Sequence, residues 1–172
     1  MAKNTQQTPA SRVNREFSSG GVVYKKEGDR VLWLVARTAP SKLFPKAVWR
    51  LPKGWLDDAG PGIPGPMASG EVRATEEGLR DTALREVREE GGISAKVIKK
   101  IGSTKFFYTI PGRGNILKFV TFYLMEWEKE LPEGFDGETS EVAWLPYEEA
   151  VKTLSFSREK EVLKKAKDLL PL

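Results

Sequence analysis

The sequence contains neither cysteine nor histidine among its 172 residues. These absences exclude disulfide bonds, thiol chemistry, Ser-His and Cys-His nucleophiles, and zinc sites built from cysteine and histidine. A bound metal would therefore take oxygen ligands, which hard cations such as Mg²⁺ or Mn²⁺ prefer. Acid–base chemistry is left to carboxylates, lysine and tyrosine.

Long apolar runs are also missing, since none approaches the roughly 20 residues that a membrane-spanning helix needs. Residues 1–15 are polar and lack the apolar core of a signal peptide, so we expect no export and a cytoplasmic location. With 28 basic and 24 acidic residues the net charge is only +4. This small excess suits a small anionic ligand or simple solubility, and it does not favour a nucleic-acid partner.

The length and the ordinary composition fit one globular domain. We predict a flexible tail at 1–16 and a single domain at 17–172. Alternating apolar residues and turn signals predict strands at 20–24, 31–36, 48–52, 95–101, 105–110, 116–127 and 141–145, with a hairpin turn at 111–114. Helices are predicted at 75–91, ended by two glycines, and at 147–170, broken near 155–157. This order predicts an α/β fold with a mixed sheet.

Residues 59–70 interrupt this pattern with four glycines and three prolines, which a helix or a central strand does not tolerate. We therefore predict a mobile surface loop within an insertion at about residues 57–76. The segment 59–70 has no acidic or amide side chain, so we do not expect it to supply metal ligands. Such a loop is either a tolerated insertion or a lid over the substrate.

The predicted helix at 75–91 carries Glu86, Glu89 and Glu90 within roughly 100° of one another around its axis. Like charges three and four residues apart repel, so the arrangement costs stability unless a cation lies between them. Arg85 can brace one of the carboxylates through its planar guanidinium. Taken alone, a helix rich in Arg and Glu is more typical of a solvated, salt-bridged surface.

The wider pattern resembles the Nudix box, whose signature is Gly, five residues, Glu, seven residues, Arg-Glu, an aliphatic residue, any residue, Glu-Glu, any residue, Gly and an aliphatic residue. Glu77 and the segment 85–93 match it from the first Glu to the end. A chance match of these positions is on the order of one in a million. Gly54 takes the place of the opening glycine, although 22 residues instead of five separate it from Glu77. Loop-closure entropy rises slowly with length, so an insertion here need not disturb either end.

The resemblance covers about residues 17–170 and implies a Nudix-type α/β/α sandwich with a mixed β-sheet, a catalytic helix in the middle and a C-terminal helix. It implies a metal-dependent pyrophosphohydrolase that uses Mg²⁺ or Mn²⁺. The metal ligands it implies are Glu86, Glu89, Glu90 and the backbone of Gly54. The catalytic residues it implies are Glu86, Glu90 and Arg85, together with an acid of the loop before Trp144, for which we prefer Glu141 to Glu138.

Basic and aromatic residues in or beside the matching strands are the candidates for substrate binding, although each is also consistent with surface charge or core packing. They are Arg37, Arg50, Lys53, Lys118 and Tyr108. The resemblance is greatest to the diadenosine polyphosphate hydrolase type, so we expect a small nucleotide substrate, best a dinucleoside polyphosphate. A nucleoside triphosphate, an inositol pyrophosphate, an RNA 5′ end and a non-catalytic nucleotide-binding module are the alternatives. The sequence indicates no oligomeric state.

Overall fold

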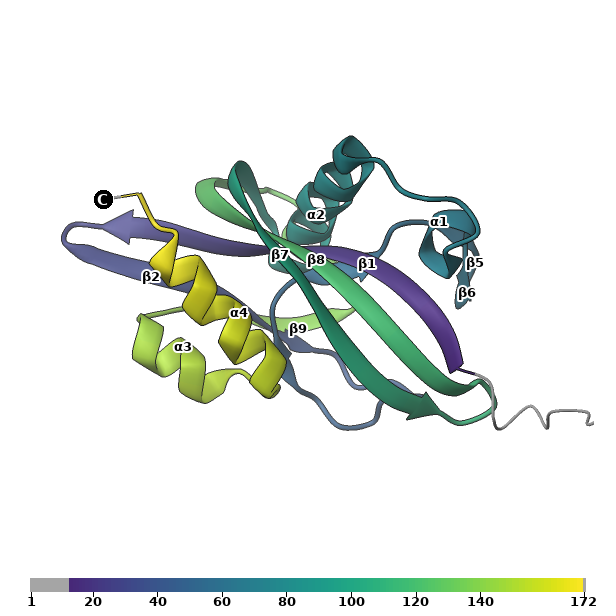
Figure 1. Cartoon of the computed structure of the whole chain (residues 1–172). Helices are drawn as coiled ribbons and strands as arrows, with labels where there is room; N and C mark the ends of the chain where they lie inside the picture. The colour runs from purple at the N-terminus through teal and green to yellow at the C-terminus, as the bar shows by residue number, and fades with distance from the viewer. Residues whose placement is uncertain (1–12, 172) are drawn as a thin grey trace, which may run out of the picture.

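A long, twisted mixed sheet forms the centre of the computed structural model, which describes residues 13–171 (Figure 1). Its strands are β1 (Val13–Glu27), β2 (Arg30–Thr38), β3 (Trp49–Arg50), β4 (Lys53–Trp55), β7 (Ile93–Ile110), β8 (Gly114–Glu130) and β9 (Thr139–Leu145). The order is β3-β2-β1-β8-β7, with β4 paired to β1 and β9 paired to β2. Strands β1 and β8 run parallel, whereas the other pairs are antiparallel.

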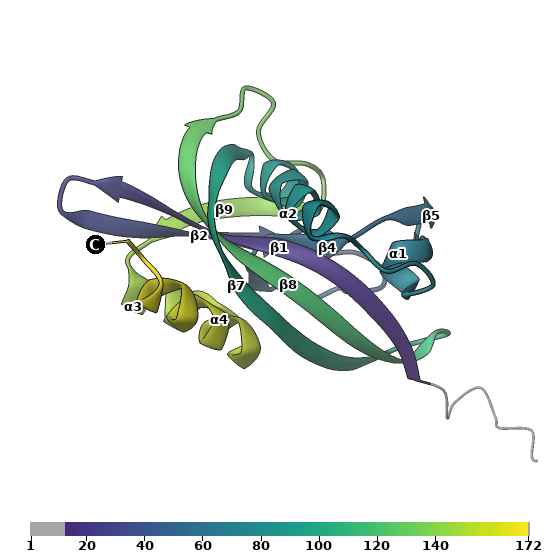
Figure 2. The same ribbon diagram turned by 45° about the horizontal axis from the view of Figure 1, so that its top comes forward.

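Helices cover both faces of this sheet (Figures 1 and 2). Helix α2 (Glu76–Gly91) lies on one face, and α3 (Tyr147–Thr153) and α4 (Ser157–Asp168) lie on the other. Because successive side chains of a strand point to opposite faces, Val23 packs in the core beside α2, whereas Val22 and Tyr24 pack in the core beside α3 and α4. The predicted α/β/α sandwich with a mixed sheet is confirmed. Within residues 13–171, no helix combines the length and the apolar character needed to cross a membrane.

Helix α2 begins and ends close to where the sequence predicts. Thr75 is its N-cap and accepts a hydrogen bond from the amide of Gly78 at 3.0 Å. The helix ends at Gly91, and Gly92 takes the left-handed conformation. Its buried apolar residues Ala83 and Val87 hold the helix against the sheet and thereby fix the direction of its acidic side chains.

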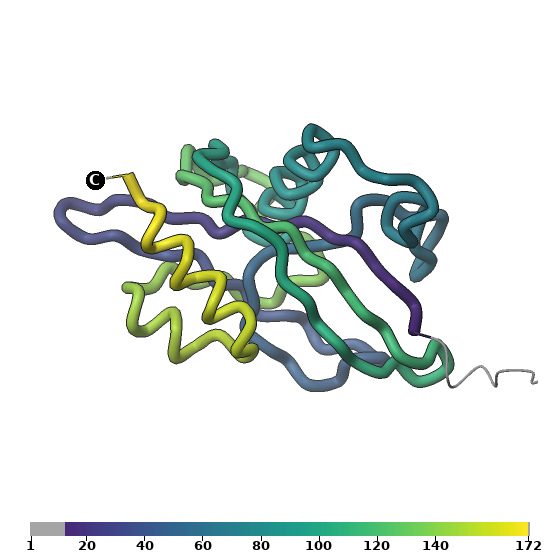
Figure 3. The backbone as a smooth tube through the Cα atoms, viewed as in Figure 1, coloured from purple at the N-terminus to yellow at the C-terminus, as the bar shows by residue number. Residues whose placement is uncertain are grey.

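The strands predicted at 95–101 and 105–110 are one strand, β7, which forms a long hairpin with β8 (Figure 3). Their pairing changes register at three points, between Ser94 and Ala95, Val97 and Lys99, and Lys100 and Gly102. Such bulges let a long strand bend without ending. The predicted turn at 111–114 and the break between the two C-terminal helices are confirmed.

Two predictions about chain organisation need correction. Strand β1 begins at Val13, so residues 13–16 belong to the sheet and not to a flexible tail; residues 1–12 lie outside the described part. The insertion is not a structureless loop, because it contains β5 (Asp58–Gly60), β6 (Ile63–Pro64) and α1 (Pro66–Ser69).

The short helix of the insertion is held by Asp57. The carboxylate of Asp57 accepts hydrogen bonds from the amides of Met67 and Ala68 at 3.0 and 2.8 Å. Ala68 is fully buried. The glycines and prolines therefore belong to short strands, a helix and the turns between them, in contrast to the predicted mobile loop.

Candidate functional site

Two buried carboxylates of α2 lie beside the segment 50–54, which contains the end of β3 and most of β4. Glu86 and Glu90, one helical turn apart, are only 7% and 1% exposed. A Cβ atom at Gly54 would lie 2.3 Å from the carboxyl carbon of Glu86, so only glycine lets the backbone of β4 come this close. Sequence reasoning placed Gly54 with these two glutamates, and the structure brings the three together.

Glu90 is anchored to both sides of this segment. Its Oε2 accepts a hydrogen bond from the backbone amide of Lys53 at 3.0 Å, and its Oε1 accepts one from the Arg50 guanidinium. Burial raises the pKa of Glu90 to about 7, although Arg50 and the amide of Lys53 favour the charged form. The carboxylate is therefore buried and, despite these partners, binds a proton near neutral pH.

Fewer partners favour the charged form of Glu86 than that of Glu90. Burial, followed by the neighbouring charge of Glu90, raises the pKa of Glu86 to about 8, and Arg85 opposes this rise. Arg85 Nη2 donates to Glu86 Oε1 at 3.2 Å and to the carbonyl oxygen of Trp55 at 3.1 Å. Arg85 therefore lies between Glu86 and β4, where it can orient the carboxylate.

These pKa values predict how the stability of the metal-free protein depends on pH. Glu86 keeps its proton up to about pH 8 in the folded state, whereas its ordinary pKa is 4.5. The free energy of unfolding should therefore fall as the pH rises from about 4.5 to about 8, by about 2 kcal/mol or more, since one pKa unit is about 1.4 kcal/mol. Denaturant titrations in a chelator should show that Glu86→Gln removes the contribution of Glu86 to this decline, which extends from about pH 4.5 to about pH 8. A wild-type minus variant difference that does not change over this window would contradict the assigned protonation state.

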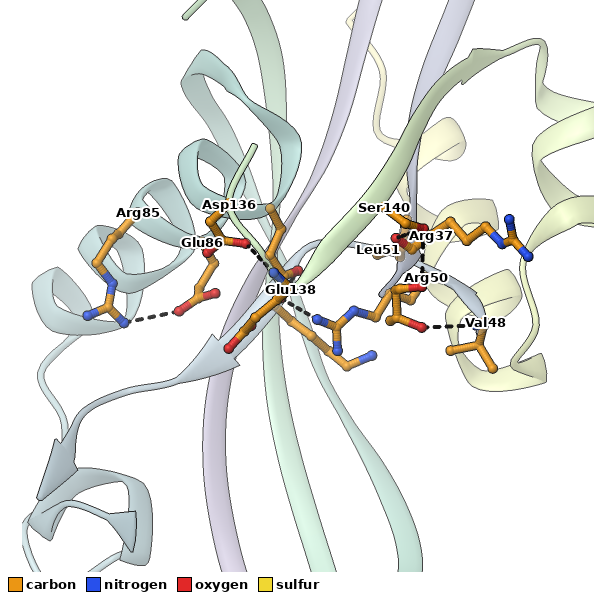
Figure 4. A network of polar contacts seen from close by, with 12 residues as sticks. Arg37, Val48, Arg50, Leu51, Arg85, Glu86, Asp136, Glu138 and Ser140 are labelled. Atoms are coloured by element: carbon orange, nitrogen blue, oxygen red, sulfur yellow. Dashed lines mark hydrogen bonds and ion pairs between the residues drawn. The ribbon is translucent and has the colours of Figure 1, made fainter. Parts of the chain in front are cut away.

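The loop before β9 brings Glu138, and not Glu141, to the carboxylates of α2. The loop is tied to the end of α2 because the Asp136 amide donates to the carbonyl oxygen of Glu89 at 2.7 Å. Glu138 is close enough to raise the pKa of both Glu86 and Glu90 (Figure 4).

The position of Glu141 in the sheet contradicts the predicted preference for Glu141 over Glu138 as the acid of this loop. Glu141 pairs with Arg37 in β2, and residues two apart in these strands, such as Val35 and Ala143, pack beside α3 and α4. Both side chains thus belong to the face opposite α2. Arg37 is exposed, and its guanidinium points away from Glu86 in Figure 4. The structure does not bring either residue to the acidic cluster.

The acidic groups fit a hard divalent cation by their chemistry, although they do not form a ready-made cage. Within residues 13–171, no group of three or more acidic side chains is arranged to hold a metal ion. Glu89 and Glu138 are exposed, and the charge of each acts on Glu86. The oxygen donors and the mutual repulsion of Glu86 and Glu90 fit a divalent cation such as Mg²⁺.

Basic groups gather next to the acidic cluster. Lys118, a partly buried residue of β8, has its pKa lowered to about 8 by burial and by the charges of Lys53 and Arg50. No ion pair to another described residue offsets this charge. The hydroxyl of Ser18, on the same face of the sheet, is buried without a hydrogen-bond partner among the described residues. The Lys118 ammonium is therefore a candidate for binding an anionic group of a ligand.

A third buried carboxylate, Glu16, organises the aromatic end of the site, and sequence reasoning missed it by placing it in the tail. Its Oε1 accepts a hydrogen bond from Arg113 at 2.6 Å. Its Oε2 accepts hydrogen bonds from Trp55 Nε1 at 3.3 Å and from the Tyr108 hydroxyl at 3.5 Å. Burial and then the charge of Glu16 raise the pKa of Tyr108 to about 12. Glu16 therefore holds Tyr108, a predicted substrate-binding residue, beside β4.

Comparison with known proteins agrees with this architecture. The family described as NUDIX domain matches residues 15–166. The protein named "Putative mutator protein MutT4" of Mycobacterium tuberculosis (strain CDC 1551 / Oshkosh) is 29% identical over 160 residues, which cover 92% of this chain and 57% of that protein. The chain thus spans only 57% of the length of this relative.

Two solved structures show the same fold. A C. elegans Ap4A hydrolase in a binary complex has a TM-score of 0.57 and 19% identity, with coverage of 89% of this chain and 96% of that one. The MutT protein from Methanosarcina mazei Go1 has a TM-score of 0.62 and 16% identity, with coverage of 90% and 94%. At these identities the likeness establishes the arrangement of the sheet and helices.

Proposed function

Because the chain belongs to the NUDIX domain family, we propose that it is a pyrophosphohydrolase that cleaves a phosphoanhydride bond with the help of Mg²⁺ or Mn²⁺. Members of this family generally need divalent metal ions. The observation that carries the proposal is that two sets of charge are adjacent: the buried carboxylate of Glu90 pairs with Arg50 and its charge also acts on Lys118, and Glu86 lies one helical turn from Glu90. One set suits a divalent cation and the other suits the oxygens of a phosphate chain.

In this proposal each residue has a separate task. Glu86, Glu90, Glu89 and the backbone of Gly54 would hold the cation, which would make water more acidic and would withdraw charge from phosphoryl oxygens. Arg85 orients Glu86 through its contact with Trp55. We propose Glu138, on the tethered loop, as the base that takes the proton of the attacking water, because its charge acts on Glu86.

For the substrate we propose a compound that contains a nucleoside diphosphate, with a dinucleoside polyphosphate as the first to test. Lys118 and Arg50 suit the phosphate chain, and the ring of Tyr108 offers an aromatic surface for a base beside them. A panel of dinucleoside polyphosphates, nucleoside triphosphates and ADP-ribose, read by product mass in heavy-oxygen water, tests the activity and locates the attacked phosphorus. Binding without any magnesium-dependent product would favour a nucleotide-binding module.

Lys118→Met should raise KM for the preferred substrate at least tenfold and change kcat less. A hydrogen bond to a charged group contributes about 1.5–3 kcal/mol, and about 1.4 kcal/mol is a factor of ten. Because the pKa of Lys118 is lowered to about 8, the free enzyme loses this charge as the pH rises through 8, and KM should rise there. The variant should lack that rise.

Lys105→Met is the matched control for this prediction, because Lys105 is an exposed lysine of β7 whose ammonium lies over the ring of Phe119. Its KM and the pH dependence of KM should match wild type. Equal KM values for Lys118→Met and wild type would remove Lys118 from the substrate site.

A further inference from the structure

Glu159 on α4 is fully buried, although it comes from the opposite side of the sheet to α2. Its Oε1 accepts a hydrogen bond from the backbone amide of Leu51, and its Oε2 accepts one from Lys53 Nζ at 2.6 Å. The Lys53 ammonium also lies 4.9 Å from the ring centre of Phe106. Both charges of this ion pair are buried, with side-chain exposures of 8% for Lys53 and 0% for Glu159.

The segment 51–54 is therefore held by two buried carboxylates from opposite faces of the sheet. Glu159 binds the amide of Leu51 and the side chain of Lys53, whereas Glu90 binds the amide of Lys53. Gly54, the next residue, lies against Glu86. A shift of this segment would thus change the spacing among Gly54, Glu86 and Glu90 together.

We propose that Glu159 is a positioning residue that fixes the metal-binding geometry of Gly54, Glu86 and Glu90 by holding the segment 51–54 from the far side of the sheet. This rests on the proposed function of the acidic cluster. The proposal also changes the expected role of Lys53. Because Glu159 engages the Lys53 ammonium, we expect Lys53 mainly to hold the segment 51–54 in place and not to bind substrate.

Glu159→Gln tests the proposal. The side-chain amide oxygen of the glutamine can accept one hydrogen bond, but the substitution leaves the Lys53 ammonium buried without a counter-charge. We expect Mn²⁺ affinity, measured without substrate by paramagnetic resonance, to fall at least tenfold, and kcat to fall more than KM rises. In the metal-free protein, hydrogen exchange of the Lys53 amide should speed up at least tenfold. That amide contacts Glu90 and not Glu159, so simple loss of one hydrogen bond would leave it protected.

Two controls separate positioning from general destabilisation. Glu161→Gln makes the same chemical change at an exposed site of the same helix and should leave Mn²⁺ affinity and exchange as in wild type. Val162→Ala weakens the packing of α4 in the core and should lower the melting temperature without changing Mn²⁺ affinity.

If Glu159→Gln does not fold, two double variants make the same comparison without the buried cation. Lys53→Met with Glu159→Gln keeps an acceptor for the Leu51 amide and should bind Mn²⁺ within about threefold of wild type. Lys53→Met with Glu159→Ala lacks that acceptor and should bind at least tenfold more weakly. Equal Mn²⁺ affinities in these two, or wild-type affinity and exchange in Glu159→Gln, would overturn the proposal.

The proposal for Glu159 and the proposed function can fail independently of one another. A wild-type protein that neither binds Mn²⁺ nor hydrolyses any phosphoanhydride would refute the proposed function. The exchange rate of the Lys53 amide would still decide whether Glu159 holds the segment.

Discussion

Replacing Glu86 or Glu90 by glutamine is expected to reduce turnover to about a hundredth of wild type or less. Each change removes an anionic oxygen from a site where only oxygen ligands are available, and loss of a ligand or acid–base group commonly costs a factor of this size. Glu90→Gln also removes the charged partner of Arg50. Steady-state kinetics over a range of Mg²⁺ concentrations should show that excess metal does not restore either variant.

The same variants should not be unfolded. Glu86 and Glu90 are buried and repel one another, so neutralising Glu86 should leave the metal-free protein as stable as wild type or more stable at pH 8. Asp81→Asn, which neutralises an exposed acid on the same helix, is the control and should keep full activity. Near-normal turnover in folded Glu86→Gln and Glu90→Gln would refute the placement of the active site.

The sequence predicted the catalytic helix well because its determinants are local. Thr75 supplies the N-cap, the glycines after Glu90 end the helix, and Ala83 and Val87 mark the buried face. The turn at 111–114 was found for the same reason, since glycine and proline there fix the backbone of the hairpin. The α/β/α arrangement followed from the resemblance together with these elements.

Tertiary contacts decided what the sequence did not reveal. Glu138 and Glu141 are equally acidic, and only the tether of their loop to Glu89 and the alternation of β9 distinguish them. Strand β4 follows Pro52, which favours a turn when considered alone, and forms because it pairs with β1.

Glu159 did leave a usable signal in the sequence. It shares the spacing of Val162, Leu163 and Ala166, so an acidic residue occupies the apolar face of an amphipathic helix. A charge at such a position is rarely buried without a partner. Its partner, the segment 51–54, is about a hundred residues away in the chain and is not evident before folding.

The insertion was misread because its structure depends on one side chain and on the neighbouring strand. The Asp57 carboxylate organises the first turn of α1, and Gly70, with a φ of 84°, lies against the ring of Phe17. A Cβ atom at Gly70 would be 2.7 Å from that ring. Phe17 in turn stacks on Phe119 with ring centres 5.2 Å apart. The unit therefore covers an aromatic pair of the sheet, which a count of glycines and prolines does not reveal.

Gly70→Ala should consequently destabilise the protein more than Gly62→Ala, by about 1–2 kcal/mol, a typical cost of overpacking. Both glycines have a positive φ, of 84° and 71°, so both alanines carry backbone strain. Only the alanine at position 70 meets the Phe17 ring, because the site of a Cβ at Gly62 is open. Equal decreases in the free energy of unfolding for Gly70→Ala and Gly62→Ala, measured by denaturant titration, would show that the close approach to Phe17 has no cost.

Shortening the insertion to a five-residue connection that keeps Trp55 and Leu56 should lower the free energy of unfolding by up to about 3 kcal/mol. The deletion uncovers Phe17, and fully burying such a side chain contributes about 1.5–3 kcal/mol. Mn²⁺ affinity should stay within about threefold of wild type, because Gly54, Glu86 and Glu90 are outside the deleted residues. Denaturant titration and Mn²⁺ binding on the same preparation test both parts. A deletion variant as stable as wild type would show that the unit adds nothing to packing, and loss of Mn²⁺ binding in a well-folded variant would make it part of the site.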